Sequence, residues 1–366
     1  MFSELIIQAL TAFGFTLVMI TALSKVAPNL GLMDVPSDRK RHAEATPVVG
    51  GLAIMAALVS GAMVWGDAER SFITVRDQDA LWVLLGCALF LVLTGAMDDR
   101  FQLGIFVRIG SEFLVALIVV EALNLRLMQL GDLLGIGNIQ LSTFFVYPFT
   151  MVAVFGIINA LNMLDGMDGL LASLVIATLM TFHLFTGLPP SLITLFIGSS
   201  LVAFLVSNLK LAPFIPKTFL GDAGSRLLGF IVVCLLLAAA SGQVGGVKII
   251  KPATALFLVA LPLFDMVFTT LKRIFRKGSP FAPDRGHIHH LLKDLGFSDR
   301  RALLLIVAMS VSLNFLGLML HHSIVAEYYQ FTIFCGCFAL YCLLMGQAWR
   351  VTEKTRGTIK NPGLSN

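Results

Sequence analysis

Side chains with oxygen ligands recur every three residues in the stretch NALNMLDGMDGL, residues 159–170. On a helix, three consecutive members of this series lie within about 120° and share one face. Gly166 and Gly169 weaken the helix and allow a ligand to approach the backbone closely. A plain turn is the competing interpretation, because Asp-Gly pairs commonly mark turns. The series comprises Asn159, Asn162, Asp165 and Asp168.

Three further acidic residues stand in short polar strings. Asp98 and Asp99 are adjacent in GAMDDRFQLG, and their carboxylates repel each other unless a cation, an arginine or water relieves them. They form either a solvated helix end beside Arg100 or a pair that organises Mg²⁺ or a phosphate-bearing ligand. Asp222, in FLGDAGSRLLG, lies among small residues before an apolar run, where it could cap a helix, bind a metal, or do both.

Three histidines occupy four positions in SPFAPDRGHIHHLL, residues 279–292, which at first suggests a zinc site. A closed zinc site needs four nitrogen or sulfur ligands, and no cysteine stands nearby, because all five lie in apolar runs. We therefore do not assign a metal to His287, His289 and His290 alone, and we interpret them as donors to an anion. His287 and His290 are three residues apart and could share a helical face, with Arg285 nearby.

Asp265 lies within an apolar run, in LPLFDMVF. An acidic side chain inside a membrane segment is a functional hypothesis by default. The nearby Lys272 and Arg273 favour a structural ion pair instead, and we predict that role for Asp265.

The polar strings are set between long apolar segments. Hydrophobic residues make up 57% of the 366 and charged residues only 13%, whereas soluble domains carry about 25% charged residues. The apolar runs recur along the whole chain, each close to the roughly 20 residues that cross a bilayer as a helix. The sequence therefore predicts an all-α polytopic integral membrane protein with about eleven transmembrane helices. The predicted spans are about 5–23, 48–66, 80–97, 106–123, 143–161, 170–187, 189–206, 225–241, 253–271, 302–320 and 327–348.

Basic residues are distributed unevenly between the two sides of this arrangement. Of the 26 Lys and Arg residues, all but six fall on one side. The positive-inside rule makes that side cytoplasmic, which puts the N-terminus outside and the C-terminus in the cytoplasm. The exceptions are Arg70, Arg76, Arg126, Lys248 and Lys251 on the opposite side and Arg226, which begins a span. The basic-rich side comprises the loops 24–47, 98–105, 162–169, 207–224 and 272–301 together with Arg108 and the tail from residue 349.

The polar strings all fall on that cytoplasmic side, together with DVPSDRKRHAEATPVVGG at 34–51, which contributes Lys40 and Arg41. A transporter more often concentrates polar groups near the bilayer midplane, in broken helices. A cluster at the cytoplasmic face instead suits chemistry between a water-soluble substrate and a lipid. A secondary transporter, with Asp265 as its coupling acid, is the alternative from another class.

Taken in chain order, the five strings resemble the polyprenyl-phosphate N-acetylhexosamine-1-phosphate transferase family. They are nearest to its WecA-type branch of undecaprenyl-phosphate GlcNAc-1-phosphate transferases. The resemblance implies transfer of GlcNAc-1-phosphate from UDP-GlcNAc to undecaprenyl phosphate with release of UMP. It implies Mg²⁺, with Mn²⁺ as a substitute, inhibition of the tunicamycin type, and a bacterial inner-membrane enzyme whose site faces the cytoplasm. The matching segments are RKRH (39–42) with PVVGG (47–51), MDDR (97–100), NALNMLDGMDGL, FLGDAGS (219–225) and SPFAPDRGHIHHLL.

The resemblance also assigns roles to residues. It implies a metal at Asp222 with help from Asn162, and it links Asp98 and Asp99 to the lipid phosphate and to catalysis. Gln102 departs from the pattern, because many relatives have a third acid there, and the interrupted HIHH argues mildly against a muramyl-pentapeptide donor. The implied substrate-binding residues are Asp165, Asp168, Asp284, Arg285, His287, His289, His290, Lys40 and Arg41.

Several alternatives stay open from the sequence. The donor could be another UDP-HexNAc, and the product could begin O-antigen of lipopolysaccharide, enterobacterial common antigen or a similar glycan. The acceptor phosphate has a second pKa of about 6, so it needs little help from a general base, which favours direct attack over an aspartyl-phosphate route. The family suggests a homodimer, and we expect no nucleic-acid partner.

Two regions lie outside the predicted spans. Residues 124–142 are punctuated by glycine and partly alternating, which predicts a short β-hairpin on the periplasmic surface. Residues 349–366 are predicted to form a flexible cytoplasmic tail. We therefore expect a single transmembrane catalytic domain over residues 1–348, with its active site on the basic-rich loops.

Overall fold

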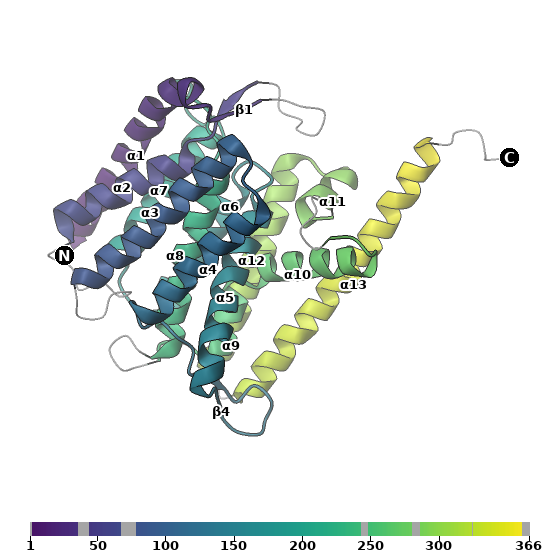
Figure 1. Ribbon diagram of the computed structural model, residues 1–366. Helices are drawn as coiled ribbons and strands as arrows, with labels where there is room; N and C mark the ends of the chain where they lie inside the picture. Colours follow the sequence, from purple (N-terminus) through teal and green to yellow (C-terminus); the bar gives the residue numbers. More distant parts are fainter. Residues whose placement is uncertain are drawn as a thin grey trace.

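The computed structural model describes residues 2–35, 44–66, 78–242, 248–279, 286–323 and 325–360. Helices form one bundle, and the long last helix leans away from it at one side (Figure 1). The helices are α1 Phe2–Leu30, α2 Gly50–Trp65, α3 Gln78–Phe101, α4 Ile105–Glu121, α5 Thr143–Leu164, α6 Leu170–Thr186, α7 Leu192–Asn208, α8 Gly221–Ser241, α9 Pro252–Leu258, α10 Ala260–Phe275, α11 Ile288–Asp294, α12 Asp299–His322 and α13 Glu327–Lys360. The strands are β1 Met33–Asp34, β2 Thr46–Pro47, β3 Gln129–Gly131 and β4 Ile139–Gln140.

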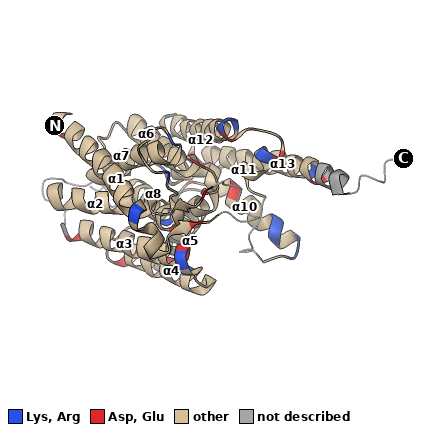
Figure 2. Ribbon diagram, turned by 90° about the horizontal axis from the view of Figure 1, so that it is seen from above, with Lys and Arg blue, Asp and Glu red and all other residues tan. Residues whose placement is uncertain are grey.

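The prediction of a helical, polytopic membrane protein is confirmed. Each predicted span contains at least one helix, and the ribbon carries few charged residues along its helices (Figure 2). Within the described part of the chain, six helices are long and apolar enough to cross a membrane, and the bent pair α9–α10 makes a seventh. The apolar helices α2, α6 and α7 are shorter, at 16 or 17 residues. The number eleven therefore stays a prediction.

Helix α8 lies at the centre of the bundle. Its sequence is apolar on every side from Phe230 to Ala240, so no face of it prefers water. Every residue from Ala223 to Ala240 is buried, and the helix packs against α2, α3 and α5. Because α8 begins at Gly221, the FLGDAGS string lies in the middle of one end of the bundle.

The ninth predicted span is not one straight helix, which corrects the prediction for residues 253–271. It consists of α9 and α10, which meet at an angle of 78°. Pro262 has no N–H, and its ring excludes the carbonyl of the residue four positions earlier, Leu258. That carbonyl instead accepts a hydrogen bond from Thr178 Oγ1 at 3.0 Å. The break turns α10 sideways across the bundle toward α13 (Figure 1).

Two small strand pairs mark the opposite ends of the bundle (Figure 1). Strands β1 and β2 pair antiparallel at the end where α8 begins, and β3 and β4 pair antiparallel at the far end. The hairpin predicted within 124–142 is therefore present. Helix α13 continues to Lys360, so the segment predicted as a tail begins as helix, and residues 361–366 lie outside the described part.

Candidate functional site

One cavity of about 590 Å³ opens at the end of the bundle where α8 begins. Its walls come from the loops at 24–47, 162–169, 207–224 and 272–301 and from the end of α3. The structure thus brings together polar strings that lie far apart in the sequence. Six of the chemistry-bearing residues that line it are Asp99, Asn162, Asp165, Asp168, Asp222 and His290.

The first turn of α8 presents Asp222 beside Asn162 of α5. Asn162 Nδ2 donates to Asp222 Oδ1 at 3.0 Å and to Ser225 Oγ at 2.8 Å, so the two residues assigned to a metal are in contact. Gly221 makes this placement possible, because its φ is +73° and an added Cβ would lie 2.5 Å from Asp99 Oδ2.

Asp99 caps the start of α8. Its Oδ1 accepts a hydrogen bond from Asp222 N at 3.0 Å and its Oδ2 accepts one from Ala223 N at 3.4 Å. Free N–H groups and the helix dipole at a helix N-terminus favour a negative charge there. Asp99 therefore fixes the end of α3 to α8 while its side chain still lines the cavity.

The PVVGG string supports this arrangement from behind. Val48 forms a parallel bridge with Phe219, and the N–H groups of Gly50 and Gly51 donate to Phe219 O at 3.0 Å and Leu220 O at 3.1 Å. The chain entering α2 is therefore hydrogen-bonded to the chain entering α8. The string has a bracing role that the sequence did not predict.

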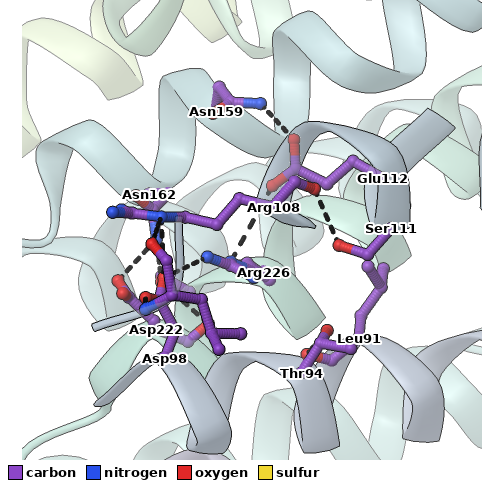
Figure 3. Close-up of polar contacts among 12 residues, drawn as sticks. Leu91, Thr94, Asp98, Arg108, Ser111, Glu112, Asn159, Asn162, Asp222 and Arg226 are labelled. Carbon is purple, nitrogen blue, oxygen red and sulfur yellow. Dashed lines mark hydrogen bonds and ion pairs between the residues drawn. The ribbon is translucent and has the colours of Figure 1, made fainter. Parts of the chain in front are cut away.

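Asp98 is buried behind the cavity wall, with only 4% of its surface exposed, in a network of charged groups (Figure 3). Its Oδ2 accepts a hydrogen bond from Arg226 Nη2 at 2.6 Å and lies 3.3 Å from Arg108 Nε, and its Oδ1 accepts one from Leu103 N at 2.8 Å. The paired acids therefore differ: Asp99 faces the cavity, and Asp98 is held by two guanidinium groups.

Glu112 extends the same network away from the cavity (Figure 3). It is buried on α4, its Oε1 lies 3.8 Å from Arg226 Nε, and its Oε2 accepts a hydrogen bond from Asn159 Nδ2 at 2.5 Å. Asn159, the first member of the three-residue series, thus points to Glu112, whereas Asn162, Asp165 and Asp168 line the cavity.

Asp165 and Asp168 follow α5 in the turn that leads to α6. Burial, followed by the negative charges of Asp222, Asp99 and Asp168, raises the pKa of Asp165 to about 8. Asp168 forms an ion pair with Lys217 Nζ at 2.5 Å. The sequence did not single out Lys217, because nothing in its neighbourhood indicates that it meets a residue 49 positions away.

The three histidines of the HIHH string point to three different places. His287 precedes α11 in an extended conformation, and its Nδ1 lies 2.7 Å from Asp265 Oδ2. His289 is buried against Gly166, where an added Cβ would lie 2.3 Å from its Nε2. His290 lines the cavity. A helical face shared by His287 and His290 is therefore not formed.

Burial and charge distinguish these imidazoles. Burial, followed by the charges of His290, His287 and Lys293, lowers the pKa of His289 well below 6.5. Its two ring nitrogens have no hydrogen-bond partner within the described ranges. His289 is therefore a neutral spacer between α11 and the turn at Gly166.

Asp265, predicted to pair with Lys272 or Arg273, receives its hydrogen bonds from other residues. They come from His287, the backbone of Ile288 and Tyr341. Four further residues with predicted roles, Lys40, Arg41, Asp284 and Arg285, lie outside the described residues.

The donor set fits a hard divalent cation in kind. Asp222, Asp99 and Asp165 bring carboxylates and Asn162 an amide to one cavity, where a cation would relieve the repulsion that raises the pKa of Asp165. Over the ranges that the structure describes, no three His, Cys, Asp or Glu side chains lie close enough together to ligate one metal ion. The residues therefore suit Mg²⁺ or Mn²⁺ by their chemistry.

Comparison with known proteins gives consistent matches. Residues 81–240 match glycosyl transferase family 4. The chain is 34% identical over 346 residues to the undecaprenyl-phosphate alpha-N-acetylglucosaminyl 1-phosphate transferase of Yersinia pestis, covering 93% of this chain and 91% of that one. Proteins of the same name from Escherichia coli K12 and Haemophilus influenzae are also 34% identical, over 94% and 89% of this chain and 92% and 90% of theirs.

Proposed function

Because this chain belongs to glycosyl transferase family 4, we propose that it transfers GlcNAc-1-phosphate from UDP-GlcNAc to undecaprenyl phosphate and releases UMP. The chain is an enzyme, a glycosyl-1-phosphate transferase. The observation that supports this substrate pair best is the single cavity into which acids and an imidazole from separate helices converge. Its volume of about 590 Å³ lies within the usual size range of small-molecule sites.

The donor diphosphate is proposed to bind beside Asp222 and Asn162. These two residues would hold a Mg²⁺ or Mn²⁺ ion, which when bound neutralises the diphosphate and stabilises the departing UMP. His290, Lys217 and Lys293 also line the cavity and add donors that suit an anion. His290 is the member of the HIHH string with direct access to the nucleotide sugar.

The acceptor phosphate is proposed to bind on the other side of Asp222, near Asp98. Arg108 keeps 44% of its side chain exposed, and the Nη1 atom of Arg226 is buried with no hydrogen-bond partner among the described residues. Both guanidinium groups contact Asp98, and the exposed one of Arg108 offers donors to a phosphate, whereas Arg226 is buried behind it. In this arrangement Asp98 orients the arginines, while Asp99 fixes α8 and faces the donor.

We propose a single, direct displacement. The lipid phosphate is largely dianionic at pH 7, so its oxygen attacks the β-phosphorus without needing a base. The oxygen–phosphorus bond to the lipid forms as the bond from the β-phosphorus to the UMP oxygen breaks. Donor that is chiral at the β-phosphorus should give product of inverted configuration, and retention would indicate a covalent enzyme intermediate.

The membrane arrangement is proposed from the charge distribution. The six long helices, the bent pair, the short apolar helices α2, α6 and α7, and α4 would make eleven crossings. The N-terminus would lie outside and the C-terminus in the cytoplasm of a bacterial inner membrane. The cavity lies at the basic-rich end, which would face cytoplasmic UDP-GlcNAc. The product would be the lipid-linked start of a surface glycan such as O-antigen or enterobacterial common antigen. A homodimer is proposed from the family alone.

The direct test is UMP release by the purified chain given UDP-GlcNAc, undecaprenyl phosphate and Mg²⁺. Asp222→Asn should abolish UMP release while the protein still inserts into membranes and unfolds cooperatively. Asp132→Asn is the matched control, because Asp132 lies at the far hairpin, where it accepts a hydrogen bond from Gly137 N. UMP release with UDP-GalNAc but not with UDP-GlcNAc would show that UDP-GalNAc is the donor. No UMP release with any UDP-sugar would favour the transporter alternative.

A further inference from the structure

Asp265 is a completely buried carboxylate that the proposed reaction does not use. Three hydrogen bonds satisfy it. Tyr341 Oη donates to Oδ1 at 2.8 Å, Ile288 N donates to Oδ1 at 2.9 Å, and His287 Nδ1 donates to Oδ2 at 2.7 Å. A buried carboxylate without such partners would be strongly destabilising, so the three donors and Asp265 form one structural unit.

Asp265 reaches this position because the membrane helix breaks. The 78° bend between α9 and α10 directs the first turns of α10 beneath α11 and across α13 (Figure 1). Phe264 then packs against the rings of Phe338 and Tyr341, with centroids 5.3 and 5.8 Å apart. This packing holds the Tyr341 hydroxyl at Asp265.

The hydrogen bonds to Asp265 fix the start of α11 at two consecutive residues. His287 is the residue before the helix, and Ile288 is its first residue. The His287 carbonyl in turn accepts the N–H groups of His290 at 3.0 Å and Leu291 at 3.1 Å, which form the first turn. The position of His290 at the cavity therefore depends on the anchor at Asp265.

The contacts of His287 also indicate which of its ring nitrogens donates. Its Nε2 lies 3.4 Å from Arg273 Nη2, and a guanidinium has only donors, so Nε2 accepts. The proton then lies on Nδ1 and is donated to Asp265. An imidazole committed on both nitrogens is not available to hold substrate, which separates His287 from His290.

We propose that Asp265, together with Tyr341, is a positioning residue for nucleotide-sugar binding. It holds His287 and the first turn of α11 so that His290 and Lys293 face the cavity. It acts on donor binding and not on the acceptor or the chemical step. The assignment of the ligand as a nucleotide sugar rests on the proposed function.

The most informative variant is Tyr341→Phe, which removes one of the three donors and keeps the ring packing. We expect the KM for UDP-GlcNAc to rise about three- to tenfold, with kcat and the KM for undecaprenyl phosphate changed less than about twofold. Asp265→Asn should have a larger effect of the same kind, because the amide presents a donor to one of the groups that now donates to the carboxylate. Asp265→Glu, which keeps both acceptor oxygens, should recover part of the loss. Tyr329→Phe, an exposed position on the same helix, is the matched control and should leave both KM values unchanged.

A second readout does not depend on activity. Backbone amides of residues 286–295 should exchange hydrogen faster in ligand-free Tyr341→Phe than in the parent chain or Tyr329→Phe, because α11 loses part of its anchor. Unchanged exchange in this segment, or a kcat loss with an unchanged KM for UDP-GlcNAc, would overturn the positioning role. If the parent chain itself releases no UMP, the proposed function fails, and faster exchange would still support the anchor.

Discussion

Asp98 and Asp265 are both buried acids at the same end of the bundle, yet the protein stabilises them in different ways. Asp98 is held by the guanidinium groups of Arg226 and Arg108, so charge is balanced by charge (Figure 3). Asp265 is held by a hydroxyl, a backbone N–H and an imidazole N–H. The charged network lies beside Asp222, where two phosphorylated substrates are proposed to meet, whereas the hydrogen-bonded one lies behind α11 and sets geometry.

The two kinds of contact differ in what their loss costs in stability. Removing one partner of a buried ion pair leaves a charge without compensation and costs about 3–5 kcal/mol, whereas losing one hydrogen bond to a buried group costs about 1–3 kcal/mol. The two regions should therefore respond differently to substitutions of similar size.

The largest effect is expected for Arg226→Leu. It leaves Asp98 and Glu112 buried without the cation between them, and we expect the free energy of unfolding to fall by about 3–5 kcal/mol, together with loss of UMP release. Equilibrium unfolding in mixed micelles measures the change in stability, and UMP release by the purified variant measures the loss of activity. Adding Glu112→Leu should recover part of the stability, because an apolar pair replaces one of the unbalanced charges. If Arg226→Leu alone is as stable as the parent, Arg226 does not balance the charges of Asp98 and Glu112.

A smaller effect is expected for Tyr341→Phe, which removes one of the hydrogen bonds to Asp265. Asp265 keeps two of its three donors, so the free energy of unfolding should fall by about 1–2 kcal/mol. The same unfolding measurement checks this, with Tyr329→Phe as the control. A loss as large as that of Arg226→Leu would remove the distinction between the two regions.

The free energy of unfolding should also depend on pH, because of His289 in α11. The pKa of His289 is lowered well below 6.5 in the folded protein, so below pH 6.5 the unfolded chain binds a proton that the folded protein does not. Stability should therefore fall as the pH drops below about 6.5, by up to about 1.4 kcal/mol per pH unit from this group. His289→Gln should reduce the slope, measured as unfolding free energy between pH 5 and 7. An identical slope in the variant would mean that other groups cause it.

The smallest change in stability is expected for Arg108→Leu. Arg108 also contacts Asp98, but its side chain is 44% exposed, so solvent screens the pair and the loss should stay below about 1 kcal/mol. Its proposed contact with the acceptor predicts a raised KM for undecaprenyl phosphate with little change in the KM for UDP-GlcNAc. If the KM for the donor rises instead, the two substrates have been placed on the wrong sides of Asp222.

Much of the fold could be predicted from the sequence, because a helix that crosses a membrane must satisfy its own backbone and be apolar over its length. Each predicted span contains a helix, and the hairpin within 124–142 is present. The bend at α9–α10 was missed although Pro262 was visible, because a proline does not specify how far the next helix turns. That depends on how α10 packs against α5, α12 and α13. The carbonyl of Leu258 accepts a hydrogen bond from Thr178 of another helix.

The sequence by itself determined the class of protein, the family, and the residues that gather at one end, because apolar length and short polar strings are local properties. It grouped Asp98 with Asp99 and the three histidines with one another, because they are neighbours in the chain. Only the tertiary structure separated them. Asp98 meets Arg226 across 128 positions, and Asp265 meets His287 and Tyr341 across 22 and 76. Such contacts depend on how separate helices pack, and adjacent side chains on a helix point about 100° apart, so neighbours in the chain take different partners.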